Sequence, residues 1–137
     1  MLVCDAGGRA DAGYFGELMA LDARGRGNAG LVIDGAVRDD AALLASGFPV
    51  FHRVLAPYAC AKAEAPSVGE PVALGGAVVA PGDMVVGDLG GGVVVPAARW
   101  SRVAAEVDAL EDGEAAVRDA LRRGERLTAL IGLEGLA

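Results

Sequence analysis

The sequence predicts an α/β fold in which a parallel β-α-β unit precedes an antiparallel meander and a long C-terminal helix. Two apolar, strand-like runs at 2–4 and 31–33 are separated by one helical segment with short connections. Strands that are joined in this way pair in parallel. Farther along, brief apolar runs alternate with glycine-rich turns, and the last third of the chain has helical periodicity. These three observations define the fold class.

The first strand and helix come from the N-terminal quarter of the chain. The apolar run at 2–4 predicts a strand that turns at 5–8. Helical composition follows at 17–24. The expected apolar face of this helix consists of its three large aliphatic side chains, which are Leu18, Met19 and Leu21.

The central strand is predicted at 31–33, where a continuous run of Leu, Val and Ile is typical of a strand that is buried on both faces. Asp34 and Gly35 are expected to interrupt it. A small helix at 41–45 and a further short strand at 47–51 complete this half of the chain.

The second half is different in kind, because strong turn signals separate its short apolar runs. It predicts an antiparallel meander with strands at 70–74, 77–80, 84–87 and 93–95. A long helix is expected at 99–123, with an apolar stripe at heptad-like spacing that consists of Val103, Val107, Leu110, Val117 and Leu121. Glu114 takes a position on that stripe. Either it is paired or binds a metal, or the helix frays there beside Gly113 and exposes it.

Composition limits the classes of function. With 137 residues and 53% apolar residues, the chain is expected to form one domain over 1–137. The net charge is −7 and no basic stripe is interleaved with aromatics, which argues against nucleic-acid binding. No apolar run is long enough to span a membrane, and the N-terminus lacks a signal-peptide pattern. The chain has two cysteines, and they do not form a spaced motif, so they suggest neither a disulfide framework nor a zinc site. We therefore expect a cytoplasmic protein that binds small molecules, metal ions or other proteins.

The candidate site lies where the central strand ends, at Arg38, Asp39 and Asp40. Ends of buried strands and starts of helices are where α/β proteins place ligand groups. The alternative is that Asp39 or Asp40 caps the next helix and that Arg38 is a surface pair partner. His52, the only histidine, is not part of a nucleophile-elbow motif, and no dinucleotide-binding or P-loop pattern is present.

Three acidic positions could hold a hard cation such as Mg²⁺ or Mn²⁺, namely Glu17, Asp39 and Glu114. Backbone amides at the start of the helix at 17–24 could bind a carboxylate, and Arg38 could add a bidentate contact. This combination suits an α-keto acid, whose enolate a metal and Arg38 would stabilise.

Several motifs together resemble the RraA-like family, which includes divalent-metal-dependent class II pyruvate aldolases. The resemblance runs from about Leu2 to Gly124. It is carried by V-C-D-A-G-G (3–8), A-G-Y-F-G-E-L (12–18), R-G-N-A-G-L-V-I-D-G-A-V-R-D (26–39), G-F-P-V-F (47–51) and P-V-A-L-G-G-A-V-V-A-P-G-D-M-V-V-G-D (71–88). It implies a layered α/β/β sandwich of the swivelling-domain type, which assembles as a homotrimer or homohexamer.

The resemblance also implies roles for individual residues. Asp39 would hold the metal, Arg38 would contact the pyruvate unit and its enolate, and Glu17 would lie in the metal's water network. The amides of Leu18 and Met19 would hold the substrate carboxylate. Glu114, from the late helix of a neighbouring subunit, would complete the metal site. The implied reaction is cleavage of a 4-hydroxy-2-oxo dicarboxylic acid to pyruvate, with oxaloacetate decarboxylation as a related activity.

The chain departs from the family pattern in two places. Where the family usually has D-x-D-G-V, this chain has D-L-G-G-G at 88–92, so the second acidic residue is replaced by glycine. Family members also usually carry a segment ahead of the first strand, so the domain is expected to be N-terminally shortened. The rival interpretation is a non-catalytic regulator that binds the ribonuclease RNase E, for which a net charge of −7 would suit a basic partner.

Overall fold

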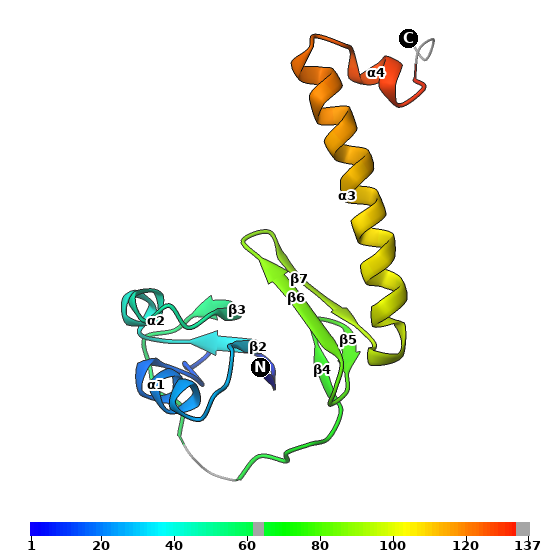
Figure 1. Cartoon of the computed structure of the whole chain (residues 1–137). Coiled ribbons are helices and arrows are strands. Elements are labelled where there is room, and N and C mark those ends of the chain that lie inside the picture. The colour runs from blue at the N-terminus through cyan, green and yellow to red at the C-terminus, as the bar shows by residue number, and fades with distance from the viewer. Residues whose placement is uncertain (62–64, 134–137) are drawn as a thin grey trace. The chain divides into compact units, whose positions relative to one another are not determined.

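The computed structural model describes residues 1–61 and 65–133 of the chain (Figure 1). It divides into two compact units, Met1–Ala97 and Ala98–Ala137. The expectation of one domain over 1–137 stays a prediction.

A three-stranded parallel sheet with strand order β1-β2-β3 organises the first unit. Helices α1 and α2 form the connections between consecutive strands, so the predicted β-α-β unit is confirmed. The bounds are β1 Leu2–Arg9, α1 Glu17–Gly25, β2 Leu31–Val37, α2 Asp40–Ser46 and β3 Val50–Leu55.

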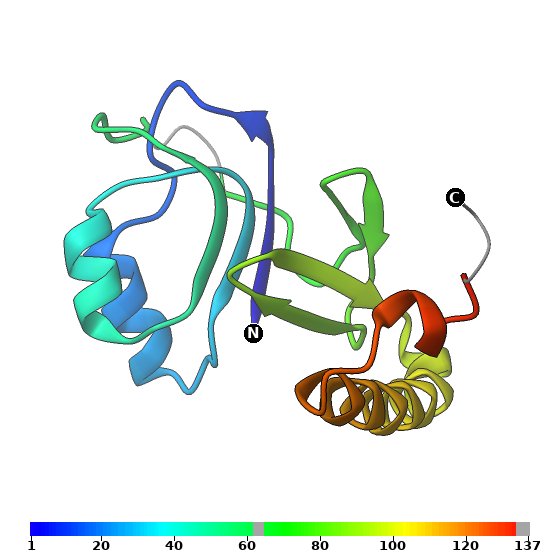
Figure 2. The same ribbon diagram turned by 90° about the horizontal axis from the view of Figure 1, so that it is seen from above.

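The core of this unit lies between the sheet and its two helices. Leu31 and Val37 of β2 are fully buried, and Phe15 stacks on Phe48 with ring centroids 6.4 Å apart. The remaining buried members of the cluster are Ala20, Ala23, Ile33 and Leu43. Figure 2 shows both helices on one face of the sheet and the later hairpins on the other face. This arrangement confirms the layered α/β/β fold.

The predicted apolar face of α1 is wrong. Leu18, Met19 and Leu21 are 72%, 50% and 52% exposed, whereas Ala20 and Ala23 are buried. Large side chains of β2 and Phe15 already fill the space beneath the helix, so only small side chains fit on the side that faces the sheet.

Both early strands run farther than their local sequence predicts. β1 continues through the expected turn at 5–8 to Arg9, with a register shift after Asp5. β2 continues through Asp34 and Gly35 for two reasons. The Asp34 carboxylate accepts a hydrogen bond from Arg53, and Gly35 leaves room for Ala6 of the neighbouring strand β1. β3 starts later than predicted, at Val50, and extends to Leu55.

The sequence predicts one continuous meander, whereas the structure has two separate antiparallel hairpins. The first consists of β4 Val72–Leu74 and β5 Ala77–Val79, and the second of β6 Met84–Asp88 and β7 Gly91–Val95. Asp83 lies in the turn between them, where its carboxylate accepts hydrogen bonds from the amides of Ala80 and Ala97. These bonds lower the pKa of Asp83. These two hydrogen bonds hold the chain in a turn at the point where the predicted meander would have paired β5 with β6.

The second unit contains α3 Trp100–Arg122 and α4 Leu127–Leu130, and the turn Ala97–Arg99 precedes α3. The long helix is confirmed and is continuous through Gly113, so the frayed-turn alternative is wrong. Glu114 is exposed and accepts a hydrogen bond from Arg118 one turn later, at 3.1 Å. None of the described helices is long and apolar enough to cross a membrane.

Candidate active site

The loop that precedes α1 runs along the end of β2 and brings two parts of the candidate site together. Phe15 forms a parallel bridge with Val37. The Tyr14 amide donates to the Ala36 carbonyl, and the Arg38 amide donates to the Phe15 carbonyl, both at 2.9 Å. These bonds place the start of α1 beside the residues that follow β2. The site therefore lies at the carboxyl edge of the parallel strands, as predicted.

Asp39 caps α1 rather than its own helix. It occupies the position before α2, yet its carboxylate makes no capping bond there. Its Oδ2 instead accepts a hydrogen bond from the Glu17 amide at 3.2 Å, which is the first amide of α1. The sequence alternative in which Asp39 only caps the following helix is therefore wrong.

The backbone of Asp39 is in the left-handed region, with φ 62° and ψ 39°. It is the one non-glycine residue with positive φ among the described residues. Aspartate tolerates this conformation better than most residues, but it still costs roughly 1 kcal/mol. The conformation turns the Asp39 side chain away from α2 and toward the start of α1.

Arg38 lies beside this carboxylate. Its Nη1 is 3.7 Å from Asp39 Oδ2, and the two side chains are 37% and 35% exposed. A long, half-exposed pair of this kind contributes little to stability. The guanidinium keeps N–H groups for an anionic ligand, so the pair does not exhaust its bonding capacity.

The first turn of α1 presents free amides at the same place. The first bond within the helix runs from the Ala20 amide to the Gly16 carbonyl at 3.0 Å. The amides of Leu18 and Met19 precede that ladder and therefore have no acceptor within the helix. The positive end of the helix dipole also lies here. A helix start of this kind suits an anionic group such as a carboxylate.

The carboxylates that the sequence singled out are only partly brought together. The Asp39 carboxylate accepts a hydrogen bond from the Glu17 backbone amide at the start of α1, whereas Glu114 lies on α3 in the second unit and pairs with Arg118. Within residues 1–61 and 65–133 no group of three or more His, Cys, Asp or Glu side chains could hold a metal. The role of Glu114 stays a prediction.

The donor set nevertheless fits a hard divalent cation. The Asp39 hydrogen bond and the Arg38 contact both involve Oδ2, which leaves Oδ1 free for another partner. Glu17 supplies a second, exposed carboxylate in the first turn of α1. Mg²⁺ is commonly held by one or two carboxylates, with water and substrate oxygens in the other positions. Asp39 and Glu17 supply carboxylates of the kind that such a site uses.

Sequence reasoning missed an ion pair between a buried carboxylate and an exposed arginine on the other face of the sheet. Asp34 is 9% exposed, and both of its oxygens accept hydrogen bonds from Arg53 of β3. The Gly75 amide in the β4–β5 turn donates to Asp34 Oδ2 at 3.0 Å. The Arg53 and Gly75 bonds lower the pKa of Asp34 to about 2. This cluster joins the sheet to the first hairpin, and the only sequence signal for it was a charged residue inside an apolar run.

Comparison with known proteins identifies the family. The family model described as RraA-like, Aldolase/RraA, matches residues 1–95. The chain belongs to the RraA-like family. The predicted resemblance is therefore confirmed, and the matched residues contain Glu17, Arg38 and Asp39.

The proteins that this chain resembles carry different descriptions. A protein of Halalkalibacterium halodurans named putative 4-hydroxy-4-methyl-2-oxoglutarate aldolase is 36% identical over 70% of this chain and 46% of its own length. A crystal structure of an uncharacterised Pseudomonas syringae protein has a TM-score of 0.88 and 29% identity, over 96% of this chain and 62% of that one.

A third similar protein is described by an inhibitor family. The structure of Streptomyces coelicolor RraAS2, described as an unusual member of the RNase ES inhibitor RraA protein family, has a TM-score of 0.74 and 32% identity. The match covers 89% of this chain and 61% of RraAS2. This chain therefore spans less than two thirds of the length of each of these three relatives.

Proposed function

We propose that this RraA-like chain is a divalent-metal-dependent lyase. It would cleave 4-hydroxy-2-oxo dicarboxylic acids, such as 4-hydroxy-4-methyl-2-oxoglutarate, to pyruvate and a second keto acid. One observation carries the proposal: the Asp39 carboxylate, the Arg38 guanidinium and the free amides of α1 converge at one point. The aldolase name of the H. halodurans relative supports the same class of reaction.

Asp39 and Glu17 would hold Mg²⁺ or Mn²⁺, and Glu114 of a neighbouring copy in a homotrimer or homohexamer would be the third acidic ligand. A bound divalent cation supplies a Lewis acid for the keto group. The protein's part is to hold the substrate. The amides of Leu18 and Met19 would bind its C1 carboxylate, and Arg38 would lie against the oxygen that becomes negative in the enolate.

The reaction needs no redox partner. The 4-hydroxyl loses its proton, the C3–C4 bond breaks, and the electron pair of that bond forms the enolate of pyruvate while C4 becomes a carbonyl carbon. A proton added at C3 completes pyruvate. Oxaloacetate would lose carbon dioxide from C3 and form the same enolate, so we propose its decarboxylation as a second activity. Arg38 stabilises the charge that is common to both routes.

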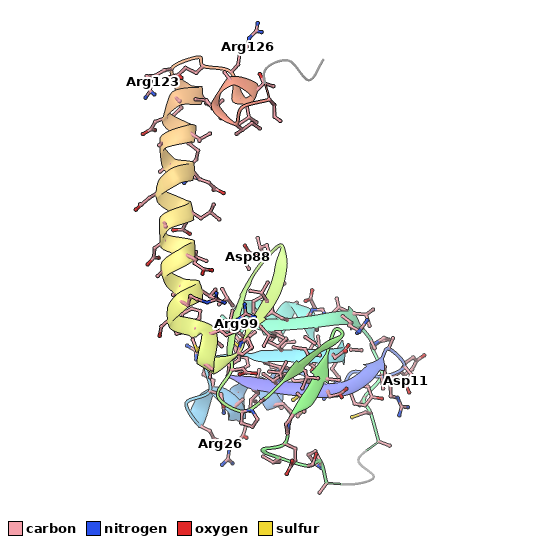
Figure 3. The ribbon with its side chains drawn as sticks, turned by 90° about the vertical axis from the view of Figure 1, so that its right-hand side faces the viewer. Asp11, Arg26, Asp88, Arg99, Arg123 and Arg126 are labelled. Carbon is pink, nitrogen blue, oxygen red and sulfur yellow. The ribbon has the colours of Figure 1, made fainter. Side chains whose placement is uncertain are left out.

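The test is release of pyruvate from both substrates, in the presence of Mg²⁺ and of a chelator. We expect Mg²⁺-dependent release, and we expect Arg38→Ala to lower kcat by about 10²- to 10³-fold, as for the loss of an oxyanion contact. Arg26→Ala is the matched control. Arg26 extends from the end of α1 into solvent and pairs with Asp22 (Figure 3).

The alternative is a non-catalytic regulator that binds RNase E. The description of RraAS2 as an unusual member of the RNase ES inhibitor RraA protein family favours this alternative. The net charge of −7 would suit a basic partner. A folded sample that releases no pyruvate with either substrate but inhibits RNase E would favour this alternative. Pyruvate release that depends on Arg38 would exclude it as the main role.

A further inference from the structure

Two glycines of the loop before α1, Gly13 and Gly16, surround the Arg38 side chain. Both are buried, and neither has a positive φ; Gly16 is extended, with φ −157° and ψ −171°. Any residue can adopt such a backbone. The reason for glycine at these positions must therefore be space rather than conformation.

The two glycines differ in what an added methyl group would meet. At Gly16 a Cβ would lie 2.5 Å from Asp39 Oδ2, 3.0 Å from Arg38 Cγ and 3.2 Å from Arg38 Nε. All three are side-chain atoms that can move. At Gly13 a Cβ would lie 2.8 Å from Arg38 Cβ, 3.0 Å from the Arg38 amide nitrogen and 3.1 Å from the Ala56 carbonyl oxygen. Two of these belong to the backbone of the strand ends.

We propose that Gly16 is a positioning residue of the site: the absence of its side chain lets the Asp39 carboxylate lie against the first amide of α1 and beside the Arg38 guanidinium. The proposal builds on the site of the proposed lyase and adds a residue to it that touches neither metal nor substrate. Gly13 has a different role, because a side chain there would push apart the backbone that carries the site.

This assignment predicts opposite behaviour for two equally small substitutions. Gly16→Ala displaces the Asp39 carboxylate while the fold stays intact, because only mobile side chains must move. The Mn²⁺ affinity is then expected to fall by about 10- to 100-fold, the usual effect of losing a group that orients a ligand. Gly13→Ala is expected to lower the melting temperature instead. Gly25→Ala is the control, since Gly25 ends the same helix and a Cβ there would meet nothing within 4 Å.

The melting temperature is measured for wild type, Gly13→Ala and Gly16→Ala. Two further quantities are measured for wild type, Gly16→Ala, Asp39→Ala, Gly25→Ala and the Gly16→Ala/Asp39→Ala double variant. The first is the amide proton shift of Glu17 by NMR without metal, which reports the Asp39 hydrogen bond directly. The second is Mn²⁺ affinity by titration calorimetry. We expect Gly16→Ala to move the Glu17 resonance in the same direction as Asp39→Ala, and we expect the double variant to bind Mn²⁺ no more weakly than Asp39→Ala alone.

An unmoved Glu17 resonance in Gly16→Ala would overturn the proposal. If Gly16→Ala fails to fold, the double variant decides: recovery of the fold on removal of the Asp39 side chain supports the contact, and continued unfolding overturns it. If wild type binds no Mn²⁺, the metal-dependent lyase fails. The Glu17 resonance still tests the role of Gly16 in that case, so the two failures are distinguishable.

Discussion

Substitution of Asp39 separates three contributions that one residue makes to this protein. Its carboxylate caps α1, its backbone takes a left-handed conformation, and its free oxygen is the proposed metal ligand. Asp39→Ala removes the cap, at a cost of about 1 kcal/mol, and places a less tolerant residue at positive φ, at a cost of about 1 kcal/mol more. We therefore expect the free energy of unfolding to fall by about 2 kcal/mol.

Two further variants at the same position test the capping contribution and the backbone contribution separately. Asp39→Asn keeps an acceptor for the Glu17 amide and tolerates positive φ, so we expect a stability change below about 0.5 kcal/mol, together with loss of metal binding. Asp39→Gly loses the cap but relieves the backbone, and the two effects, each about 1 kcal/mol, should nearly cancel. The neighbouring carboxylate provides the control. Asp40→Ala removes only a favourable charge from the first turn of α2, worth about 0.5 kcal/mol.

The assay is urea unfolding followed by circular dichroism, with Mn²⁺ affinity measured on the same samples. We expect Asn and Gly at position 39 to leave the free energy of unfolding close to that of wild type, and Ala to lower it by about 2 kcal/mol. Equal stability of Asp39→Ala and wild type would refute the capping and backbone arguments together. Full Mn²⁺ affinity in Asp39→Asn would refute the assignment of Asp39 as a metal ligand and leave the capping argument intact.

Three other predictions concern parts of the chain away from the site. The pKa of Asp34 falls from 3.8 to about 2 on folding, so its hydrogen bonds stabilise the fold above pH 3.8. This stabilisation is lost as the pH falls toward about 2. The free energy of unfolding, measured between about pH 4 and about pH 2, should therefore change less with pH in Asp34→Asn than in wild type. Gly113→Ala should raise the free energy of unfolding by about 1 kcal/mol, because Gly113 lies within α3 in open space, and an unchanged thermal transition would contradict this. Leu43→Ala should lower the free energy of unfolding in urea by about 2–4 kcal/mol, since Leu43 is 4% exposed. Leu44→Ala should change it by no more than about 0.5 kcal/mol, because Leu44 is 74% exposed. Equal losses for the two variants would contradict the assigned core.

Much of the fold could be predicted from local patterns. The apolar run at 31–33, the glycine-rich turns and the 3.6-residue period of the last third each report a property of neighbouring residues. They were sufficient for the parallel β-α-β unit, the short strands of the second half and the long helix, but not for the division of those strands into two separate hairpins. The same holds for the candidate site: a charged pair directly after a buried strand is visible in the sequence, and so are the motifs that mark the RraA-like family.

Contacts between distant residues could not be predicted in this way. The buried side of α1 is Ala20 and Ala23 because β2 and Phe15 fill the space below it, and no periodicity within the helix reports that. β2 continues through Asp34 because Arg53 and Gly75, 19 and 41 residues later, satisfy its carboxylate. Local propensity is overridden wherever a distant partner satisfies a group that the local pattern leaves unpaired.

The sequence by itself determined which residues are available for chemistry, because Glu17, Arg38 and Asp39 stand at predicted helix starts and a strand end. Only the tertiary structure decided how they are joined. Asp39 has a helix of its own to cap, yet it caps α1, which begins 22 residues earlier in the chain. The reason is physical. The left-handed backbone at Asp39 and the missing side chain at Gly16 leave the Glu17 amide as the donor within reach of the Asp39 carboxylate.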